Sequence, residues 1–434
     1  MKYRTVVLSA TWALFVAGVA RPSAADEGDM PTLGQLLAAG REHSPDNREA
    51  RALAKQRAAE GSESVDQLLP TFTASAGYTR NQYEVVARFP NSAGVLQQAT
   101  ITPKNQLDAT LALNVPLIDL GNFGRISSAR AEQRSSEAQA LATADTTSRD
   151  VGQAYYQLVA AEAVIESAER ALSTSEENLA TVESRRTSGL ASDLDAHRAR
   201  AEIERNRQSV ADAELLRNQA ARKLRTLTGL NPRGRAPRLP DDTNAEAPLE
   251  AWLDRVDALP AVRAAKEHTR GAEALHDAAV SAYLPTIGAK ASERFTNAVG
   301  FGYSPVWAAG ITANWTLDFA AVSAVHAENA AVEVAVAQAD RARQAARDAI
   351  EDAHDQVETE RERVVAARAQ EDASHHAADV AKARYLAGTA TQLDLVEAER
   401  DAFSAEVSRV QTEADLAYAR FALRVAAGRA LEIQ

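Results

Sequence analysis

The chain of 434 residues contains no cysteine, which excludes disulfides, thiolate metal sites and a lipid attached to an amino-terminal cysteine. Aromatic residues make up only 5% of the sequence, and 48 basic residues face 60 acidic ones without any basic cluster. An acidic chain without a basic patch is a poor ligand for nucleic acid. We therefore expect no nucleic-acid partner.

The sequence also has few long hydrophobic runs, and the clearest lies at the amino terminus. Lys2 and Arg4 precede the apolar residues 6–20, and a small-residue cleavage site follows. This order is typical of a secretory signal peptide over residues 1–25, whose removal changes the net charge from −12 to −15. Arg21 ends the run before the roughly 20 residues of a membrane-spanning helix. We expect no later stretch to span a bilayer as a helix.

What the sequence does contain is one motif used twice. Arg185-Arg-Thr-Ser-Gly-Leu-Ala-Ser-Asp-Leu-Asp195 matches Arg384-Tyr-Leu-Ala-Gly-Thr-Ala-Thr-Gln-Leu-Asp394 without a gap. An internal duplication of this length indicates one structural unit that is used twice. We expect a first repeat over residues 26–240 and a second over residues 241–434.

Each repeat opens with helical stretches that end at a proline. In the first repeat they are residues 32–42 and a stretch to Leu69, and in the second they are residues 249–258 and a stretch to Leu284. Proline lacks the amide hydrogen and disfavours helix in the residue before it, so both helices end there.

The hydrophobic period then changes from 3.6 to 2. Alternation predicts four strands, at about residues 71–85, 104–118, 286–297 and 305–318. The apolar faces carry the aromatics Phe72, Tyr78, Trp307 and Trp315, whereas Asn114 and Asn314 lie on the polar faces and Glu293 is a misfit on an apolar one. Strands of this length with two such faces are typical of a membrane β-barrel, with the apolar face toward lipid. A soluble sandwich is the alternative, but no further strand sequence is left to cover the apolar faces.

Most of the remaining sequence predicts long helices. Residues 122–186 and 320–385 contain no proline, and each segment turns at a glycine and returns, over residues 192–227 and 391–427. Apolar residues recur every seven positions, with small residues three further on: Val151, Leu158, Ile165, Leu172 and Leu179, then Ala154, Ala161, Ala168, Ser175 and Val182. This is a coiled-coil seam that permits close approach. At 1.5 Å per residue, such helices reach roughly 100 Å.

Four strands cannot close a barrel, since the smallest membrane barrels need about eight. Open strand edges cannot face lipid, so several copies must contribute strands to one barrel. The helices are about three times longer than a bilayer is thick, so they would project from it as a tube. The predicted fold is mainly α with a membrane β part, and its assembly is a conduit.

The chain resembles the TolC family of outer-membrane efflux proteins over nearly its whole mature length. The resemblance rests on Leu68-Leu-Pro-Thr71 with the strand after it, Val115-Pro-Leu-Ile-Asp119, and above all the two glycine turns. It implies a homotrimer in the outer membrane, with a twelve-stranded β-barrel joined to a periplasmic α-helical barrel. It also implies two partners, a periplasmic adaptor and an inner-membrane pump of the RND, ABC or MFS type.

The resemblance also assigns roles to the turns at residues 186–192 and 385–391. The tips that would meet the adaptor are Gly189, Leu190, Ala191, Ser192, Gly388, Thr389, Ala390 and Thr391. In the second repeat, Tyr385, Asp394 and Glu397 match residues that line the channel aperture. The residues themselves leave a simpler role open: Ser192 with Asp195, and Thr391 with Asp394, fit helix caps.

No enzymatic chemistry is expected, because the spacing assembles no nucleophile–base pair. His375 and His376 are adjacent, point to different faces of a helix and make a poor metal pair, so neither a metal nor a cofactor is expected. The sequence predicts a passive outer-membrane exit duct for small molecules or proteins. One alternative is a periplasmic coiled-coil adaptor, which normally has one hairpin inserted into lipoyl-like and β-barrel domains. Another is a structural trimeric surface protein.

Overall fold

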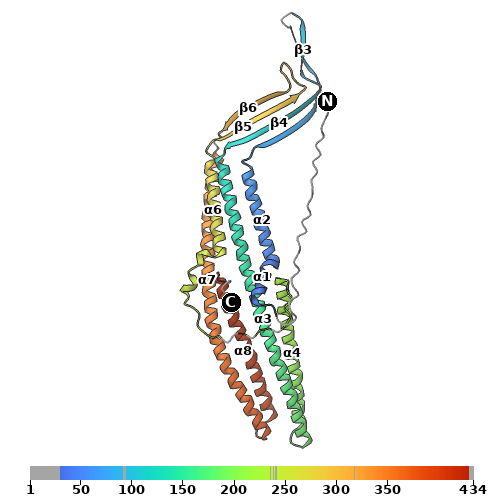
Figure 1. The fold of residues 1–434 in the computed structure, drawn as a ribbon, viewed down its shortest axis with the longest axis vertical. Helices are drawn as coiled ribbons and strands as arrows, with labels where there is room; N and C mark the ends of the chain where they lie inside the picture. Colours follow the sequence, from blue (N-terminus) through green and yellow to red (C-terminus); the bar gives the residue numbers. More distant parts are fainter. Residues whose placement is uncertain are drawn as a thin grey trace, which may run out of the picture.

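The structure is a computed structural model that describes residues 30–90, 94–234, 236, 237, 239, 242–316 and 318–429. The expected signal peptide, the expected repeat boundary at residues 240 and 241, and Leu317 lie outside the described residues. Within them the chain forms an elongated molecule, with a sheet at one end and two helical hairpins at the other (Figure 1).

The hairpins are built on the two longest helices, α3 (Leu120–Thr187) and α7 (Phe319–Leu386), which contain 68 residues each. Each turns and returns along itself, as α4 (Asp193–Thr228) and α8 (Gln392–Ala426). The prediction of uninterrupted helices here is confirmed. Figure 1 shows α3 and α7 running from the sheet to the far tips.

Shorter helices complete the upper half. They are α1 (Leu33–His43), α2 (Pro45–Asp66), α5 (Glu250–Leu253), the 3-10 turn η1 (Val256–Ala258) and α6 (Pro260–Ser281). Helix α2 packs along α3, and α6 packs against both α3 and α7. The expected helix over 249–258 is wrong as one piece. It is a single α-turn and a 3-10 turn, which end at Leu259, an extended residue before Pro260.

Four strands form the main sheet, all antiparallel in the order β1-β4-β5-β6. They are β1 (Thr71–Arg80), β4 (Asn105–Ile118), β5 (Thr286–Thr296) and β6 (Val306–Asn314). Its register keeps apolar residues opposite apolar ones: Phe72 pairs with Leu113, Tyr78 with Leu107 and Ala289 with Ile311. The two faces inferred from the alternation are therefore continuous across all four strands.

Two strand predictions are wrong in extent. The first strand ends at Arg80 rather than at residue 85, because the Asn81 amide hydrogen bonds to the Lys104 carbonyl and closes off an inserted hairpin. That hairpin consists of β2 (Val85–Pro90) and β3 (Leu96–Thr102), which pair only with each other, so two more strands lie between the first two that were predicted. Figure 1 shows it standing beyond the main sheet.

The fourth strand ends at Asn314 rather than at residue 318. Beyond it, the Trp315 indole Nε1 donates to the Tyr283 carbonyl over 3.0 Å, and Asp318 caps the start of α7. These side-chain interactions redirect the chain from strand to helix.

The core lies between the helices and repeats with the sequence. Val151, Leu158 and Leu224 are fully buried in the first repeat, and Ile350, Val357 and Val364 are fully buried in the second. The small seam residues Ala154, Ala168 and Ser175 are buried as well, which lets α3 approach its neighbours closely.

One sequence expectation about membranes needs correction. A stretch of eighteen residues in α7 reaches a mean hydropathy of 1.2, so by length and composition one helix among the described residues could cross a membrane. This stretch is almost wholly exposed, with 6% of it buried. Alanine and valine dominate residues 319–339 at the start of α7, and Glu328 and Glu333 are the only acids there. By itself the finding is weak evidence for a membrane span.

Candidate functional site

Both hairpin tips have the same backbone geometry. Gly189 and Gly388 have φ values of 74° and 76°, in the left-handed region that glycine adopts without strain. The Leu190 amide bonds to the Arg185 carbonyl and the Thr389 amide bonds to the Arg384 carbonyl, which closes both long helices with Schellman motifs. The matched glycines of the sequence are thus the residues that end α3 and α7.

The returning helices also start alike. Ser192 Oγ accepts from the Asp195 amide, and Asp195 Oδ2 accepts from the Ser192 amide over 3.0 Å. Thr391 and Asp394 repeat both bonds, at 3.2 and 2.8 Å. These capping boxes hold the pKa of both carboxyls below the ordinary value: the Ser192 hydroxyl has the largest effect on Asp195, and the Thr391 amide has the largest on Asp394. Asp394 is therefore a helix cap, and cap geometry does not distinguish it from Asp195.

The two tips expose apolar side chains at the end of the molecule. Leu190 is 70% exposed, and Leu194, Leu386 and Leu393 are also exposed. A Cβ added at Gly189 would meet no atom within 4 Å, so space at this tip is open. Exposed leucines around a rigid, small-residue turn form a surface that another protein can cover.

Tyr385 lies between the two hairpins rather than on an open surface. It is 6% exposed and packs against Val182, Ala199 and Leu395. The Arg185 guanidinium lies 4.9 Å from the centre of its ring, and Arg185 Nη1 donates to the Tyr385 carbonyl over 3.1 Å. Burial raises the pKa of Tyr385. The tyrosine thus joins α7 to α3 at the base of the tips.

Glu397 lies one turn beyond the cap of α8 and is exposed. Among the described residues, no hydrogen bond or ion pair holds its carboxylate, unlike that of Asp394. The three residues matched to an aperture thus differ in setting: Tyr385 is buried between hairpins, Asp394 forms a cap and Glu397 is free in solvent.

Above the tips, polar side chains link the two hairpins, which the sequence did not indicate. Arg400 on α8 binds the buried Glu202 on α4, and Asn178 on α3 donates to Glu399 over 3.3 Å. Higher up, Ser167 donates to Glu406 over 2.7 Å. Burial raises the pKa of Glu399 to about 6. The only sequence signal was polar residues such as Glu202 and Asn206 within a seam otherwise rich in alanine.

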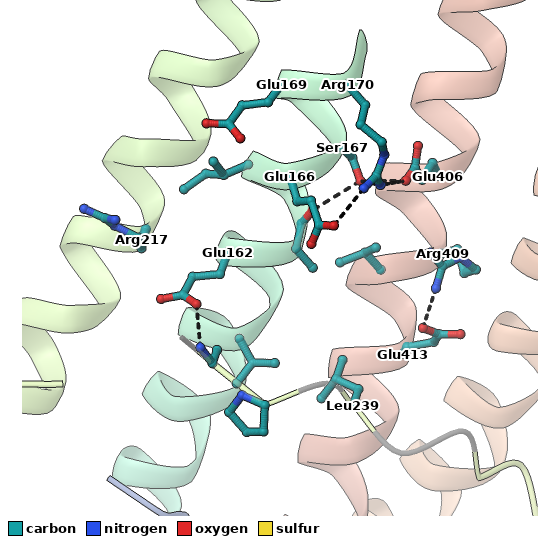
Figure 2. A pocket seen from close by; sticks show the side chains of 16 residues that line it. Glu162, Glu166, Ser167, Glu169, Arg170, Arg217, Leu239, Glu406, Arg409 and Glu413 are labelled. Atoms are coloured by element: carbon teal, nitrogen blue, oxygen red, sulfur yellow. Dashed lines mark hydrogen bonds and ion pairs between the residues drawn. The ribbon is translucent and has the colours of Figure 1, made fainter. Parts of the chain in front are cut away.

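The inter-repeat segment, meaning the described residues 229–234, 236, 237, 239 and 242–249, contacts helices α3 and α8. The amide of Ala236 donates to Glu162 over 2.7 Å, and Arg420 reaches Glu246 at 3.3 Å (Figure 2 shows the first contact). Figure 2 also shows Arg170 directed at Glu406, and Arg409 at Glu413. All of these residues except Arg420 and Glu246 line a pocket of about 710 Å³, whose acids and bases are largely paired with each other.

At the other end, the sheet presents its aromatics on the apolar face. Phe72, Tyr78 and Trp307 are all exposed, with Trp307 at 75%, and Trp315, just beyond the end of β6, is exposed as well. Glu293, the misfit on this face, pairs with Leu111 and Trp307.

The polar face contains both candidate lumen residues. Asn114 pairs with Thr71 and Lys290, and Asn314 pairs with Thr286. Polar pairs thus extend across the sheet on the side opposite the aromatics.

Known structures share this fold. A membrane protein from Pseudomonas aeruginosa is 22% identical, with a TM-score of 0.77 over 96% of this chain and 99% of that one. The Campylobacter jejuni CmeC outer membrane channel is 18% identical, with a TM-score of 0.77 over 99% and 94%. The open state of the Neisseria gonorrhoeae MtrE outer membrane channel is 22% identical, with a TM-score of 0.73 over 94% and 93%. No curated protein matches the sequence.

The family match covers both repeats. Residues 36–230 and 257–429 match the family described as outer membrane efflux protein. The two segments include the main sheet, both long hairpins and both glycine tips. The chain therefore belongs to the outer membrane efflux protein family, whose members are outer-membrane channels with a helical extension into the periplasm.

Proposed function

We propose that the chain is the passive exit duct of a tripartite export assembly, in which three copies form one channel. The observation that carries the proposal is the main sheet. Its outer strands β1 and β6 pair on one side only, so their free backbone groups need partners before the sheet can enter lipid. Four strands from each of three copies give about twelve, enough to close a membrane barrel.

In this trimer the apolar face, with Phe72, Tyr78, Trp307 and Trp315, faces lipid, and Asn114 and Asn314 face the lumen. The helices continue the barrel as a periplasmic tube, since their roughly 100 Å far exceeds a bilayer. Each repeat supplies one hairpin per copy, so six hairpin tips surround the periplasmic mouth.

The tips are the docking surface for a periplasmic adaptor, which connects the duct to an inner-membrane pump. The exposed leucines and the small residues at both turns support this role. The second repeat lines the aperture through Asp394 and Glu397, while Tyr385, buried between the hairpins, holds this repeat against the first. The pump class, whether RND, ABC or MFS, and the cargo follow from the adaptor that binds.

The alternative, a periplasmic adaptor, is less well supported. An adaptor has one hairpin set into lipoyl-like and barrel domains, whereas the described residues form two matched hairpins on one sheet. The apolar face of that sheet would remain uncovered in a soluble protein.

Arginine at Ala191 or Ala390 tests the proposal. Both alanines lie at the tips, so arginine there is expected to abolish export and adaptor crosslinking in cells while leaving a folded trimer. Arginine at Ala211, an exposed alanine higher on α4, is the matched control and should leave export unchanged. Normal export by both tip variants, or a monomer after detergent extraction, would contradict the proposal.

A further inference from the structure

Helix α3 has α4 on one flank and α8 on the other, and the three helices form a wall that is one helix thick. The two faces of this wall differ. One is covered: α1 packs through Leu36, and the inter-repeat segment packs through Ala236 and Leu239, against α3 residues such as Val159. Figure 2 shows Leu239 on this face. The opposite face holds a pocket of about 510 Å³ that only α3, α4 and α8 line.

The covered face is the outer one if the chain forms the proposed duct. A tube whose wall is one helix thick has room for added elements only on its outside, because the same elements inside would block the bore. The uncovered pocket then faces the bore, so its contents lie on the export route.

The pocket is lined by two phenols and several amides. Tyr156 comes from α3 and Tyr418 from α8, and the amides are those of Gln153, Gln157, Gln219 and Gln411. Burial raises the pKa of Tyr156 to about 12 and also raises that of Tyr418. Both phenols therefore stay neutral in the periplasm, where they offer aromatic faces and hydroxyl groups.

One carboxylate at the pocket has no partner to balance it. Asp415 on α8 makes no hydrogen bond or ion pair with another described residue. Burial raises its pKa, the nearby Glu360 raises it further, and Arg363 opposes the rise. Arg363 Nη1 lies 2.8 Å from Glu360 Oε1, so Glu360 largely neutralises the charge of Arg363.

The pocket has a second, opposite pole. Lys223 lies on α4, across α3 from Asp415, and its Nζ is 3.2 Å from Gln153 Oε1. Among the residues that line the pocket, the negative charge is thus on α8 and the positive charge on α4. Arg424 and Arg149 do not line it, but each opposes the rise in the pKa of one tyrosine, Tyr156 and Tyr418 respectively.

We propose that this pocket is a transient binding site in the wall of the duct for small aromatic molecules that carry a cationic group. The proposal rests on the proposed function only for the location of the pocket on the export route. The cationic group pairs with Asp415, and the aromatic ring lies against the faces of Tyr156 and Tyr418, which attract cations through their ring electrons. Lys223 selects against a second positive charge at the far end.

The test is direct binding to the full-length purified protein in nonionic detergent. Fluorescence anisotropy of rhodamine 6G, an aromatic cation, is titrated against the protein, with protein-free micelles as blank and the anionic dye fluorescein for comparison. Saturable binding of rhodamine 6G is expected, and fluorescein should bind at least about tenfold more weakly.

Variants assign the binding to the pocket. Asp415→Asn and Tyr418→Leu should each weaken rhodamine 6G at least about fivefold, whereas Asp415→Glu should retain it. Asp212→Asn removes the same charge from an exposed position on α4 outside the pocket, and it should have no effect. Circular dichroism and the size of the detergent complex verify that each variant is folded.

Three results would overturn the inference: no saturable binding, equal binding of the two dyes, or equal losses from Asp415→Asn and Asp212→Asn. The last would show that only the general negative field attracts the cation. Because binding is measured without export, these results do not test the proposal that the protein is an exit duct. Conversely, a failure of the duct proposal would appear as lost trimer or lost export, with the dye still bound.

Discussion

Arg400 on α8 binds both carboxylate oxygens of Glu202 on α4, with its Nε 2.9 Å from Oε2 and 3.1 Å from Oε1. Glu202 is only 4% exposed, while Arg400 keeps contact with water. The pair joins the two repeats about two and a half turns above their tips. A hairpin that moves outward must therefore either break this pair or carry its partner with it.

Removal of Arg400 should destabilise the protein more than removal of Glu202. Arg400→Met leaves a buried carboxylate with only Arg205, at 3.7 Å, and should cost about 2–5 kcal/mol. Glu202→Gln leaves an arginine that water can solvate and should cost less. Chemical unfolding of both variants and of the Glu202→Gln/Arg400→Met double variant measures this. Full additivity of the two losses would show that the residues are not coupled.

Neutralising Asp394 and Glu397 together should change the cation selectivity of single channels. Six carboxylates around one opening would concentrate a negative field there. Asp195→Asn is the internal control, because it removes the same kind of cap in the first repeat. Planar-bilayer recordings compare the two. If both variants shift selectivity equally, or neither does, Asp394 acts only as a helix cap.

Arginine should be tolerated differently on the two faces of β6. Ile311 is 74% exposed on the apolar face, so arginine there should cost about 2–4 kcal/mol near the membrane midplane. Arginine at Asn314, on the polar face, should be far milder. Folding equilibria of the two variants in lipid vesicles test this assignment, and equal damage would mean that the faces are reversed.

Glu399 should make stability depend on pH. Its folded pKa of about 6 exceeds its ordinary value of 4.5 because burial disfavours the charged form. Below about pH 4.5 the carboxyl is neutral whether folded or unfolded. As the pH rises through 6, the folded protein must ionise a buried group and loses stability.

Glu399→Gln keeps an acceptor for Asn178 and removes this charge. Relative to the natural chain, it should gain stability from about pH 4.5 to 6 and keep that gain at higher pH. Thermal unfolding midpoints at pH 4.5, 6 and 7.5 test the sign. A gap between the two proteins that does not vary with pH would contradict it.

Local signals in the sequence predicted much of the fold. Glycine at a left-handed position and Ser192 or Thr391 before a helix act through neighbouring backbone groups, so each tip could be placed from a few residues. Strand alternation is also local, and it identified both faces of the main sheet.

Contacts between distant segments could not be read in the same way. The hairpin of β2 and β3 depends on pairing between residues 85–90 and 96–102, where Gln97 and Gln98 interrupt the alternation. The burial of Tyr385 depends on which face of α7 meets the other hairpin. A single sequence does not record that choice, nor the partnership of Glu202 with Arg400, which are far apart along the chain.

The equal length of α3 and α7, 68 residues each, limits how this gene can change. Seven residues inserted into one helix alone would lower its tip by about 10 Å and leave the other behind. Insertions in the two halves are therefore tolerable only when they match, and they must be copied into α4 and α8 as well. Length variation among relatives should occur in coordinated steps, and unmatched changes should be confined to segments outside the hairpins.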